Sequence, residues 1–221
     1  MPSEASTSDR SRLKTNLRAV TELRRTAATA AERAERDAGR LAVFRQALDE
    51  TFGVPDLMVR VVWPPIVAMY WSVDPEPGTL DLIAELEERK SDILLPIISP
   101  RPGAPARQPR WASAHLGTRE VPWSAVKAGL RGMREPIADG EPENLGEADL
   151  VVMPGLAGTV SGGRLGTGGG WYDRALQYAQ PDVPRWLLLN DDEVLDDLPM
   201  DDWDQRVDAI ITESRFITCS V

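Results

Sequence analysis

The sequence is poor in the residues that carry redox and metal chemistry. It holds a single cysteine, Cys219, and a single histidine, His115. One cysteine excludes an internal disulfide framework and a cysteine metal cluster, and it suits a reducing cytoplasm. We expect Cys219 to have no role, and His115 to be structural or exposed rather than catalytic.

Long apolar runs and an excess of positive charge are also lacking. No apolar run approaches the roughly 18 residues that a membrane span needs. The polar start MPSEASTSDR has no apolar segment of the kind found in a signal peptide. The net charge of −10 argues against nonspecific binding to nucleic acid or anionic membranes. We expect a cytoplasmic protein without a nucleic-acid or membrane partner, and we take it to be a monomer.

The chain of 221 residues is long enough for one α/β domain with a sizeable core. Residues 1–9 are small and polar, and we expect them to be disordered, with the domain running over 10–221. Apolar residues at helical spacing cover Arg10 to about Phe52, with a break suggested at Gly39. Apolar strand candidates lie at 66–71, 93–98, 149–154, 185–190 and 208–212, and helix candidates at 80–89 and 172–179. This alternation predicts a mostly parallel sheet flanked by helices.

Three segments have unusual composition. Pro96 interrupts the second strand candidate and suggests an irregular strand end or an edge of the sheet. Residues 99–123 are rich in proline, glycine and arginine, which indicates a long irregular segment. Residues 190–204 contain many acids and no base, and we expect them to form a solvated face.

The stretch GGRLGTGGGWYDRAL, residues 162–176, combines glycines with polar chemistry. It lies between a strand candidate and a helix candidate, an arrangement that can cradle phosphates through backbone N–H groups. Arg164 could supply a forked donor to phosphate oxygens, and Asp173 could cap the helix or hold Mg²⁺. The Rossmann, Walker and nucleophile-elbow patterns all fail here. On chemistry alone, a phosphate pocket and a flexible glycine-rich connection stay equally open.

Read from the preceding strand onward, PGLAGTVSGGRLGTGGGWYDRAL (154–176) resembles the signature of the 5-formyltetrahydrofolate cyclo-ligase family. That signature runs roughly P-G-L-A-F-D, a short gap, then G-x-R-L-G-x-G-K/G-G-Y-Y-D. Other segments are similar to the family in the same order: LKTNLR (13–18), EPGT (76–79), MREP (133–136) and LPMDDWDQRVDAIITE (198–213). The resemblance therefore extends from about residue 12 to residue 216.

The resemblance implies a single α/β domain with a central sheet, similar to the fold of sugar-phosphate isomerases and CoA transferases. It implies an enzyme that uses MgATP to convert 5-formyltetrahydrofolate to 5,10-methenyltetrahydrofolate, with release of ADP and phosphate. ATP would phosphorylate the formyl oxygen, and N10 of the folate would then close the ring. Two alternatives stay open: a non-catalytic folate- or nucleotide-binding relative, and a different phosphotransferase or sugar-phosphate enzyme on a similar fold.

The resemblance also assigns residues to ATP. Lys14 and Arg18 would neutralise phosphates from the first helix, although at i, i+4 they could equally form a solvated helix surface. Asp173 would be a candidate ligand of Mg²⁺. The loop that wraps the phosphates would comprise Arg164, Leu165, Gly166, Thr167, Gly168, Gly169, Gly170, Trp171 and Tyr172.

A second group of residues is assigned to the folate. Glu76 would accept hydrogen bonds from donors of the pterin, and Tyr172 would orient the formyl group or a phosphate. Trp71 would lie at a substrate contact, and Trp111 would form an apolar wall for the pterin. Glu76 could instead be plain loop surface, and Trp71 could simply belong to the core.

The chain departs from the family signature at a few positions. Gly158 and Thr159 stand where the family often has Phe-Asp, so any role of that aspartate must be filled otherwise. Gly169 stands where some members carry lysine. Trp171 replaces the first tyrosine of the motif, which keeps an aromatic face but exchanges a hydroxyl for an indole N–H.

Overall fold

The computed structural model describes residues 7–53, 64–99, 109–113, 126–129, 132–137 and 145–220. The helices are α1 (Thr7–Ala27), α2 (Ala30–Phe52), α3 (Leu80–Glu88) and α4 (Trp171–Ala175), with 3-10 turns η2 (Leu145–Glu147), η3 (Leu176–Tyr178) and η4 (Asp191–Glu193). The strands are β1 (Ile66–Ala68), β2 (Asp92–Ile97), β3 (Arg110–Ser113), β4 (Val126–Ala128), β5 (Arg134–Pro136), β6 (Leu150–Pro154), β7 (Ala157–Thr159), β8 (Arg164–Leu165), β9 (Arg185–Leu188), β10 (Val194–Leu195), β11 (Ala209–Ile211) and β12 (Phe216–Thr218).

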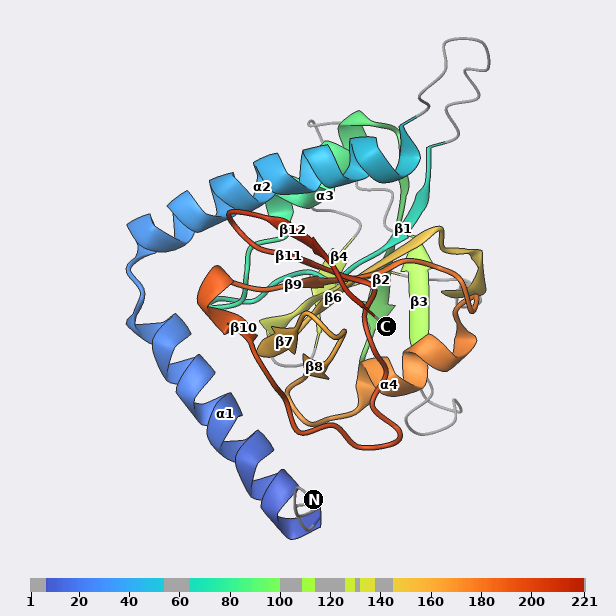
Figure 1. Cartoon of the computed structure of the whole chain (residues 1–221). Coiled ribbons are helices and arrows are strands. Elements are labelled where there is room, and N and C mark those ends of the chain that lie inside the picture. The colour runs from blue at the N-terminus through green and yellow to red at the C-terminus, as the bar shows by residue number, and fades with distance from the viewer. Residues whose placement is uncertain are drawn as a thin grey trace.

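A seven-stranded sheet in the order β12-β11-β9-β6-β1-β2-β3 forms the centre of the molecule (Figure 1). Strands β11, β9, β6, β1 and β2 run parallel to one another, and β12 and β3 pair antiparallel at the two edges. The parallel strands occupy the apolar segments that the sequence predicts. The expected α/β fold with a mostly parallel sheet is therefore confirmed.

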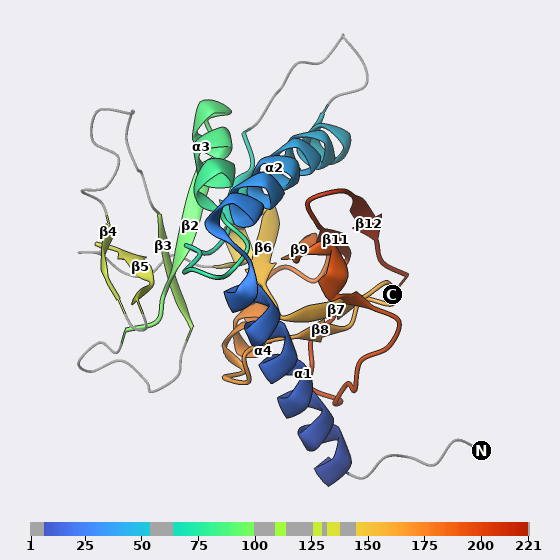
Figure 2. The ribbon, with the colours of Figure 1, turned by 90° about the vertical axis from the view of Figure 1, so that its left-hand side faces the viewer.

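The sheet is covered on both faces, because side chains alternate along each strand. On one face Val67 packs in a cluster with Phe44 of α2 and Leu82 of α3. On the other face Ala68, the next residue of β1, packs in a cluster with Tyr172 of α4. Helices α2 and α3 lie side by side over their face (Figure 2). In the part of the chain that is described, no helix is both long and apolar enough to cross a membrane.

The first helix extends away from α2 and runs beside a small sheet of order β10-β7-β8 (Figures 1 and 2). Leu17 of α1 packs there against a cluster that contains Leu156 and Leu165. The helix begins at Thr7 and has Asp9 in its first turn, where a negative charge favours a helix N-terminus. The expectation of disorder is therefore wrong for residues 7–9.

The break between the first two helices lies at Ala28 and Thr29, so the predicted break at Gly39 is wrong. Thr29 caps α2, and a capping box with Glu32 satisfies two free N–H groups, those of Thr29 and Glu32. Gly39 lies inside α2, where an added Cβ would stand 2.5 Å from the carbonyl oxygen of Glu213. The glycine permits close packing of α2 against the segment after β11.

Pro96 does not mark an edge, because β2 lies between β1 and β3. Leu94 accepts a hydrogen bond from the N–H of Met69, just after β1. The backbone of Pro96, two residues further along β2, faces the same neighbouring strand, but the pairing with β1 ends at Leu94. The missing N–H of proline therefore removes no hydrogen bond between β1 and β2. Of the two predicted alternatives, the sheet edge is wrong and the irregular strand end stays a prediction.

A buried ion pair fastens α1 to the body of the domain. Arg25 and Glu193 are 4% and 2% exposed. The Nε and Nη2 atoms of Arg25 each donate to the Glu193 carboxylate at 2.7 Å, and Nη2 also donates to the Gly155 carbonyl at 2.7 Å. Removing the guanidinium would leave the Glu193 carboxylate buried without its cation.

Replacing Arg25 with alanine is therefore expected to lower the free energy of unfolding by about 3 kcal/mol, since a buried charge loses its partner. Chemical denaturation at neutral pH measures this. Arg24→Ala is the matched control, because the Arg24–Asp192 pair is 54% and 47% exposed. Exposed pairs contribute about 0.5 kcal/mol or less. Equal losses for the two variants would contradict a structural role for the buried pair.

Candidate active site

The glycine-rich stretch forms a hairpin that leads into a short helix. Strands β7 and β8 pair antiparallel with Gly158 opposite Arg164, and residues 166–170 then connect to α4. Gly168 and Gly170 have φ of +94° and +59°, a conformation that favours glycine. The helix predicted at 172–179 is split into the five-residue α4 and the turn η3. So short a helix contributes little dipole, and any anion here must be held mainly by side chains and loop N–H groups.

Arg18 lies against this loop. Its Nε donates to the carbonyl oxygen of Gly166 at 2.8 Å. A Cβ added at Gly168 would stand 3.4 Å from the Arg18 guanidinium carbon, so the side chain also lies along Gly168. The structure thus brings Arg18 and the glycine loop together, as the sequence predicts. Among the described residues the remaining guanidinium N–H groups of Arg18 have no partner, and they are available to an anion.

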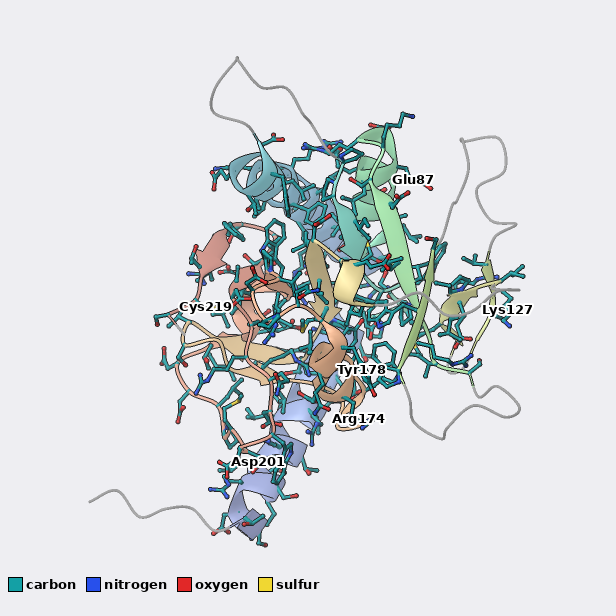
Figure 3. The ribbon with its side chains drawn as sticks, turned by 90° about the vertical axis from the view of Figure 1, so that its right-hand side faces the viewer. Glu87, Lys127, Arg174, Tyr178, Asp201 and Cys219 are labelled. Carbon is teal, nitrogen blue, oxygen red and sulfur yellow. The ribbon has the colours of Figure 1, made fainter. Side chains whose placement is uncertain are left out.

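Lys14, one helical turn before Arg18, is paired with two carboxylates. Its Nζ donates to Oδ2 of Asp201 at 2.6 Å and to Oδ2 of Asp204 at 2.5 Å, rather than facing the loop freely. Figure 3 shows Asp201 beside α1. Burial opposes the charge on Lys14, but the hydrogen bonds and charges of the two carboxylates outweigh it and raise the Lys14 pKa. Lys14 stays protonated, but its role toward a phosphate remains a prediction.

These contacts correct part of the expectation for the acidic run at 190–204. Besides Asp201, Asp204 and Glu193, the run contains Asp191, which pairs with Arg215 at 2.7 Å. Hydrogen bonds from Arg215 are the first cause of a lowered Asp191 pKa. Part of the run therefore pairs with basic residues near the two ends of the chain. Asp192, Asp196, Asp197 and Asp202 are exposed, as expected of a solvated face.

Arg164 is held at the base of the loop. It is 8% exposed, and its Nη2 donates to Oδ1 of Asp173 at 3.0 Å. Its Nη1 donates to the carbonyl oxygen of Pro154 at 3.3 Å. The same Asp173 oxygen accepts the N–H of Gln205 at 3.2 Å. Asp173 therefore orients Arg164 and also ties the loop to the segment that carries Asp201 and Asp204.

An aromatic cluster lies beside Arg164. The ring centroids of Trp111 and Trp171 are 5.2 Å apart, and those of Trp171 and Tyr172 are 4.9 Å apart. The Arg164 guanidinium carbon lies 5.7 Å from the Tyr172 ring centroid. Burial raises the pKa of the Tyr172 hydroxyl, which is therefore a neutral donor. Trp171 keeps its aromatic packing here despite replacing the tyrosine of the family signature.

Three buried polar atoms of this cluster lack a hydrogen-bond partner among the described residues. They are Nε of Arg164, Nε1 of Trp111 and the hydroxyl of Tyr172. Buried donors are almost always paired in native proteins, and orphaned ones call for a ligand or water. Three such donors on neighbouring side chains mark this as a place where a polar ligand would be bound.

Glu76 lies in the loop after β1 and is largely buried. Its Oε2 accepts the N–H of Val73 at 2.9 Å, which leaves Oε1 for another donor. Burial raises the Glu76 pKa, and the Val73 N–H and the Arg25 charge only partly offset this. The Glu76 carboxylate also adds to the raised pKa of Tyr172, so the two groups share one neighbourhood.

The two tryptophans assigned to substrate have packing roles. Trp71 is partly buried against the cluster that α2 and α3 form with the sheet. Trp111 is 2% exposed, so it cannot offer a broad open wall, although its indole N–H is one of the orphaned donors. Their contacts with a substrate stay predictions. His115 lies outside the described residues.

The departure at Gly158 and Thr159 has a local explanation. Thr159 is 1% exposed, and its Oγ1 accepts the N–H of Gly163 at 2.9 Å across the hairpin turn. A Cβ at Gly158 would stand 2.8 Å from a methyl of Leu187. The pair thus serves the hairpin and its packing on β9, and it does not open the glycine loop.

No group of three or more histidine, cysteine, aspartate or glutamate residues is placed to hold a metal ion within the described ranges. Oδ1 of Asp173 is already shared by Arg164 and Gln205, and Oδ2 has no partner among the described residues. The role of Asp173 toward Mg²⁺ stays a prediction.

Sequence reasoning gave no role to Arg25, Asp201 or Asp204. Arg25 lies about two helical turns after Arg18, and Lys14, Thr21 and Arg25 form the buried face of α1. This helical spacing was a usable signal for Arg25. The two aspartates had none, because their partner is more than 180 residues away in the chain.

A cavity of about 220 Å³ lies elsewhere, at the corner between α1 and α2. Its charged lining includes Arg24, Arg25, Asp192 and Glu193. The arginines and carboxylates here pair with each other. We therefore place the candidate site at the glycine loop, where buried donors are unpaired, rather than in this cavity.

Comparison with known proteins agrees with the sequence signature. The model of the 5-formyltetrahydrofolate cyclo-ligase family matches residues 60–213. A 5-formyltetrahydrofolate cyclo-ligase of Mycolicibacterium smegmatis is 34% identical over 152 residues, which cover 68% of this chain and 75% of that protein. One from Escherichia coli K12 is 28% identical over 162 residues, which cover 70% of this chain and 84% of that protein.

Two solved structures share the fold. The NMR structure of Aquifex aeolicus 5,10-methenyltetrahydrofolate synthetase superposes with a TM-score of 0.72 at 23% identity, covering 95% of this chain and 94% of that one. A synthetase from Mycoplasma pneumoniae gives a TM-score of 0.62 at 17% identity, covering 90% and 98%.

Proposed function

The chain belongs to the 5-formyltetrahydrofolate cyclo-ligase family, and we propose that it converts 5-formyltetrahydrofolate to 5,10-methenyltetrahydrofolate at the expense of ATP. The observation that carries the proposal is the set of orphaned donors around Arg164, Trp111 and Tyr172. They lie beside a glycine loop that Arg18 also contacts. Cations and polar donors at one loop suit a phosphorylated, partly aromatic reaction centre.

The chemistry requires activation of the formyl oxygen, which is a poor leaving group. In the proposed reaction the formyl oxygen attacks the γ-phosphorus of ATP, the bond to the β-phosphate oxygen breaks, and ADP leaves. N10 then attacks the formyl carbon. The C–O bond breaks, phosphate departs with the former formyl oxygen, and N10 loses its proton. Catalysis consists mainly of holding the reactants in line and stabilising charge on the phosphoryl group.

We assign the phosphates to the glycine loop, with Arg18 on one side and Arg164 at its base. Arg164 is already oriented by Asp173, so little reorganisation is needed when charge develops nearby. The neutral Tyr172 hydroxyl would donate to the formyl or phosphoryl oxygen, and the raised pKa keeps it protonated. We assign the pterin donors to Glu76, whose Oε1 faces no donor among the described residues.

The proposal is tested by incubating purified protein with 5-formyltetrahydrofolate and MgATP while recording the absorbance of the methenyl product. We expect absorbance to rise only when ATP is present, with ADP formed in equal amount. Binding of folate or ATP in calorimetry with no absorbance rise would identify a non-catalytic relative. Turnover of ATP with another acceptor, and no affinity for folate, would identify a different phosphotransferase.

A further inference from the structure

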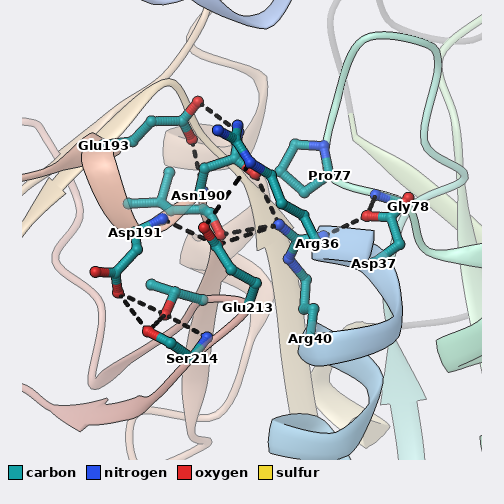
Figure 4. A network of polar contacts seen from close by, with 12 residues as sticks. Arg36, Asp37, Arg40, Pro77, Gly78, Asn190, Asp191, Glu193, Glu213 and Ser214 are labelled. Carbon is teal, nitrogen blue, oxygen red and sulfur yellow. Dashed lines mark hydrogen bonds and ion pairs between the residues drawn. The ribbon is translucent and has the colours of Figure 1, made fainter. Parts of the chain in front are cut away.

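A buried arginine on α2 joins three parts of the domain. The side chain of Arg40 is fully buried. Its Nη2 donates to Oδ1 of Asn190 at 2.8 Å and to the carbonyl oxygen of Leu189 at 3.3 Å, and it lies 3.8 Å from Oε2 of Glu213. These partners follow β9 and β11, so Arg40 fixes α2 against the ends of two central strands (Figure 4). A buried guanidinium is stable only while its hydrogen-bond partners stay in place, so these contacts hold α2 in a fixed position.

Asp37, one turn before Arg40 on α2, connects this buried arginine to the loop after β1. Its Oδ1 pairs with Nη1 of Arg40 and accepts the N–H of Gly78 at 2.9 Å (Figure 4). Glycine at position 78 permits this contact, because a Cβ would stand 2.4 Å from Oδ2 of Asp37 and the carboxylate would have to move. Gly78 lies two residues after Glu76 in the chain.

The other hydrogen bonds of the loop are mostly internal or local. Val73 N–H donates to Glu76, and Ser72 and Thr79 exchange two side-chain to backbone hydrogen bonds. These bonds shape the loop, and one long contact, from the Tyr70 hydroxyl to the carbonyl oxygen of Pro77 at 3.4 Å, ties it to the buried segment after β1. The second tie from α2 is the Arg33–Asp74 pair, and Asp74 is 74% exposed. Such an exposed ion pair contributes little to holding the loop against α2.

We propose that Asp37 is a positioning residue for the folate, which acts through Gly78 to hold Glu76 in place. The inference rests on the proposed function, because Glu76 is the group assigned to the pterin. Asp37 itself contacts no substrate. Its pairing with the buried Arg40 gives the loop a fixed reference, and a Glu76 carboxylate displaced by an ångström would bind a ligand much less well. Asp37 should therefore affect folate binding and leave ATP binding unchanged.

The test compares steady-state constants for both substrates in three variants. Asp37→Ala is expected to raise KM for 5-formyltetrahydrofolate about tenfold, with KM for ATP changed by less than about twofold. Asp37→Asn retains an acceptor for Gly78 and should give a smaller rise. Asp49→Asn is the matched control, because Asp49 lies on the same helix and pairs with Arg89 instead. It should match the wild type.

Gly78→Ala tests the same contact if Asp37→Ala fails to fold. It keeps both charges of the Asp37–Arg40 pair but pushes the Asp37 carboxylate away from the loop, and it should also raise KM for folate selectively. In the double variant the new methyl occupies the space left by the carboxylate, so its defect should be smaller than the product of the single defects. Equal rises of KM for both substrates, or an unchanged KM for folate in Asp37→Ala and Gly78→Ala, would overturn the inference.

Failure of the proposed function would look different. A wild-type protein with no turnover and no folate affinity would remove the reaction itself. Amide hydrogen exchange at Gly78 then still tests the anchor, because exchange should be faster in Asp37→Ala than in Asp49→Asn. Identical exchange in these variants would remove the positioning contact independently of activity.

Discussion

Replacing Arg164 with alanine is expected to lower kcat/KM by about a thousandfold, because a charged donor would be lost where phosphoryl charge develops. Stability should fall by only about 1–2 kcal/mol, since Asp173 is left without the arginine but is not deeply buried and keeps the Gln205 N–H. Steady-state kinetics and denaturation of the same samples separate the two effects. The kcat/KM of Arg164→Lys should lie between those of the wild type and Arg164→Ala, because lysine keeps the charge but loses the forked geometry.

Arg206→Ala is the control for the Arg164 variant. Arg206 is exposed and donates to the carbonyl oxygen of Ser161 at 2.6 Å, in the turn that connects β7 to β8. The change removes one arginine that contacts the same hairpin from the segment before β11, without touching the buried cluster, so activity should stay within about twofold of the wild type. Similar activities for the alanine variants at 164 and 206 would exclude Arg164 from the reaction.

Replacing Glu76 with glutamine is expected to raise KM for 5-formyltetrahydrofolate about a hundredfold, with little effect on KM for ATP. Glutamine can still accept the Val73 N–H, so the loop should keep its shape while the charge is lost. Asp74→Asn is the matched control, because Asp74 lies in the same loop and is exposed. Equal effects on KM for ATP and folate would contradict the assignment of Glu76 to the pterin.

The Glu76 variant should also reveal the pKa shift. Burial raises the Glu76 pKa, so the folded state favours the protonated acid. The stability that the protonated acid provides is present at low pH and is lost as pH rises through the raised pKa. Folate binding requires the carboxylate, so it should weaken as pH falls through the raised pKa. Glu76→Gln should lose that pH dependence and unfold at a higher temperature than the wild type at pH 7. Unchanged thermal stability would indicate that the carboxylate is not strained by burial.

The sequence predicts the parts of this molecule that depend on local pattern. Continuous apolar runs identify the parallel strands, and the signature around Arg164 identifies the loop that Arg18 contacts. Neighbouring residues in these segments carry enough information to identify both the strands and the loop. The fold class and the proposed site therefore follow from the chain before any tertiary contact is known.

Contacts between distant segments could not be predicted in the same way. The pairing of Lys14 with Asp201 and Asp204 depends on how the last strands return to α1. Gly39 resembles a helix break, but its role is visible only when Glu213 lies against α2. The acids of the 190–204 run that form ion pairs could not be told from the exposed ones, because their basic partners lie far away in the chain.

Phosphorylation of the formyl oxygen is tested most directly by isotope transfer. 5-Formyltetrahydrofolate labelled with ¹⁸O in the formyl group would be converted with MgATP in unlabelled water, and the released phosphate would be examined by ³¹P NMR. The proposed reaction predicts that the phosphate carries the formyl ¹⁸O in every turnover. Methenyl product accompanied by unlabelled phosphate would contradict it, because ATP would then have been hydrolysed by water.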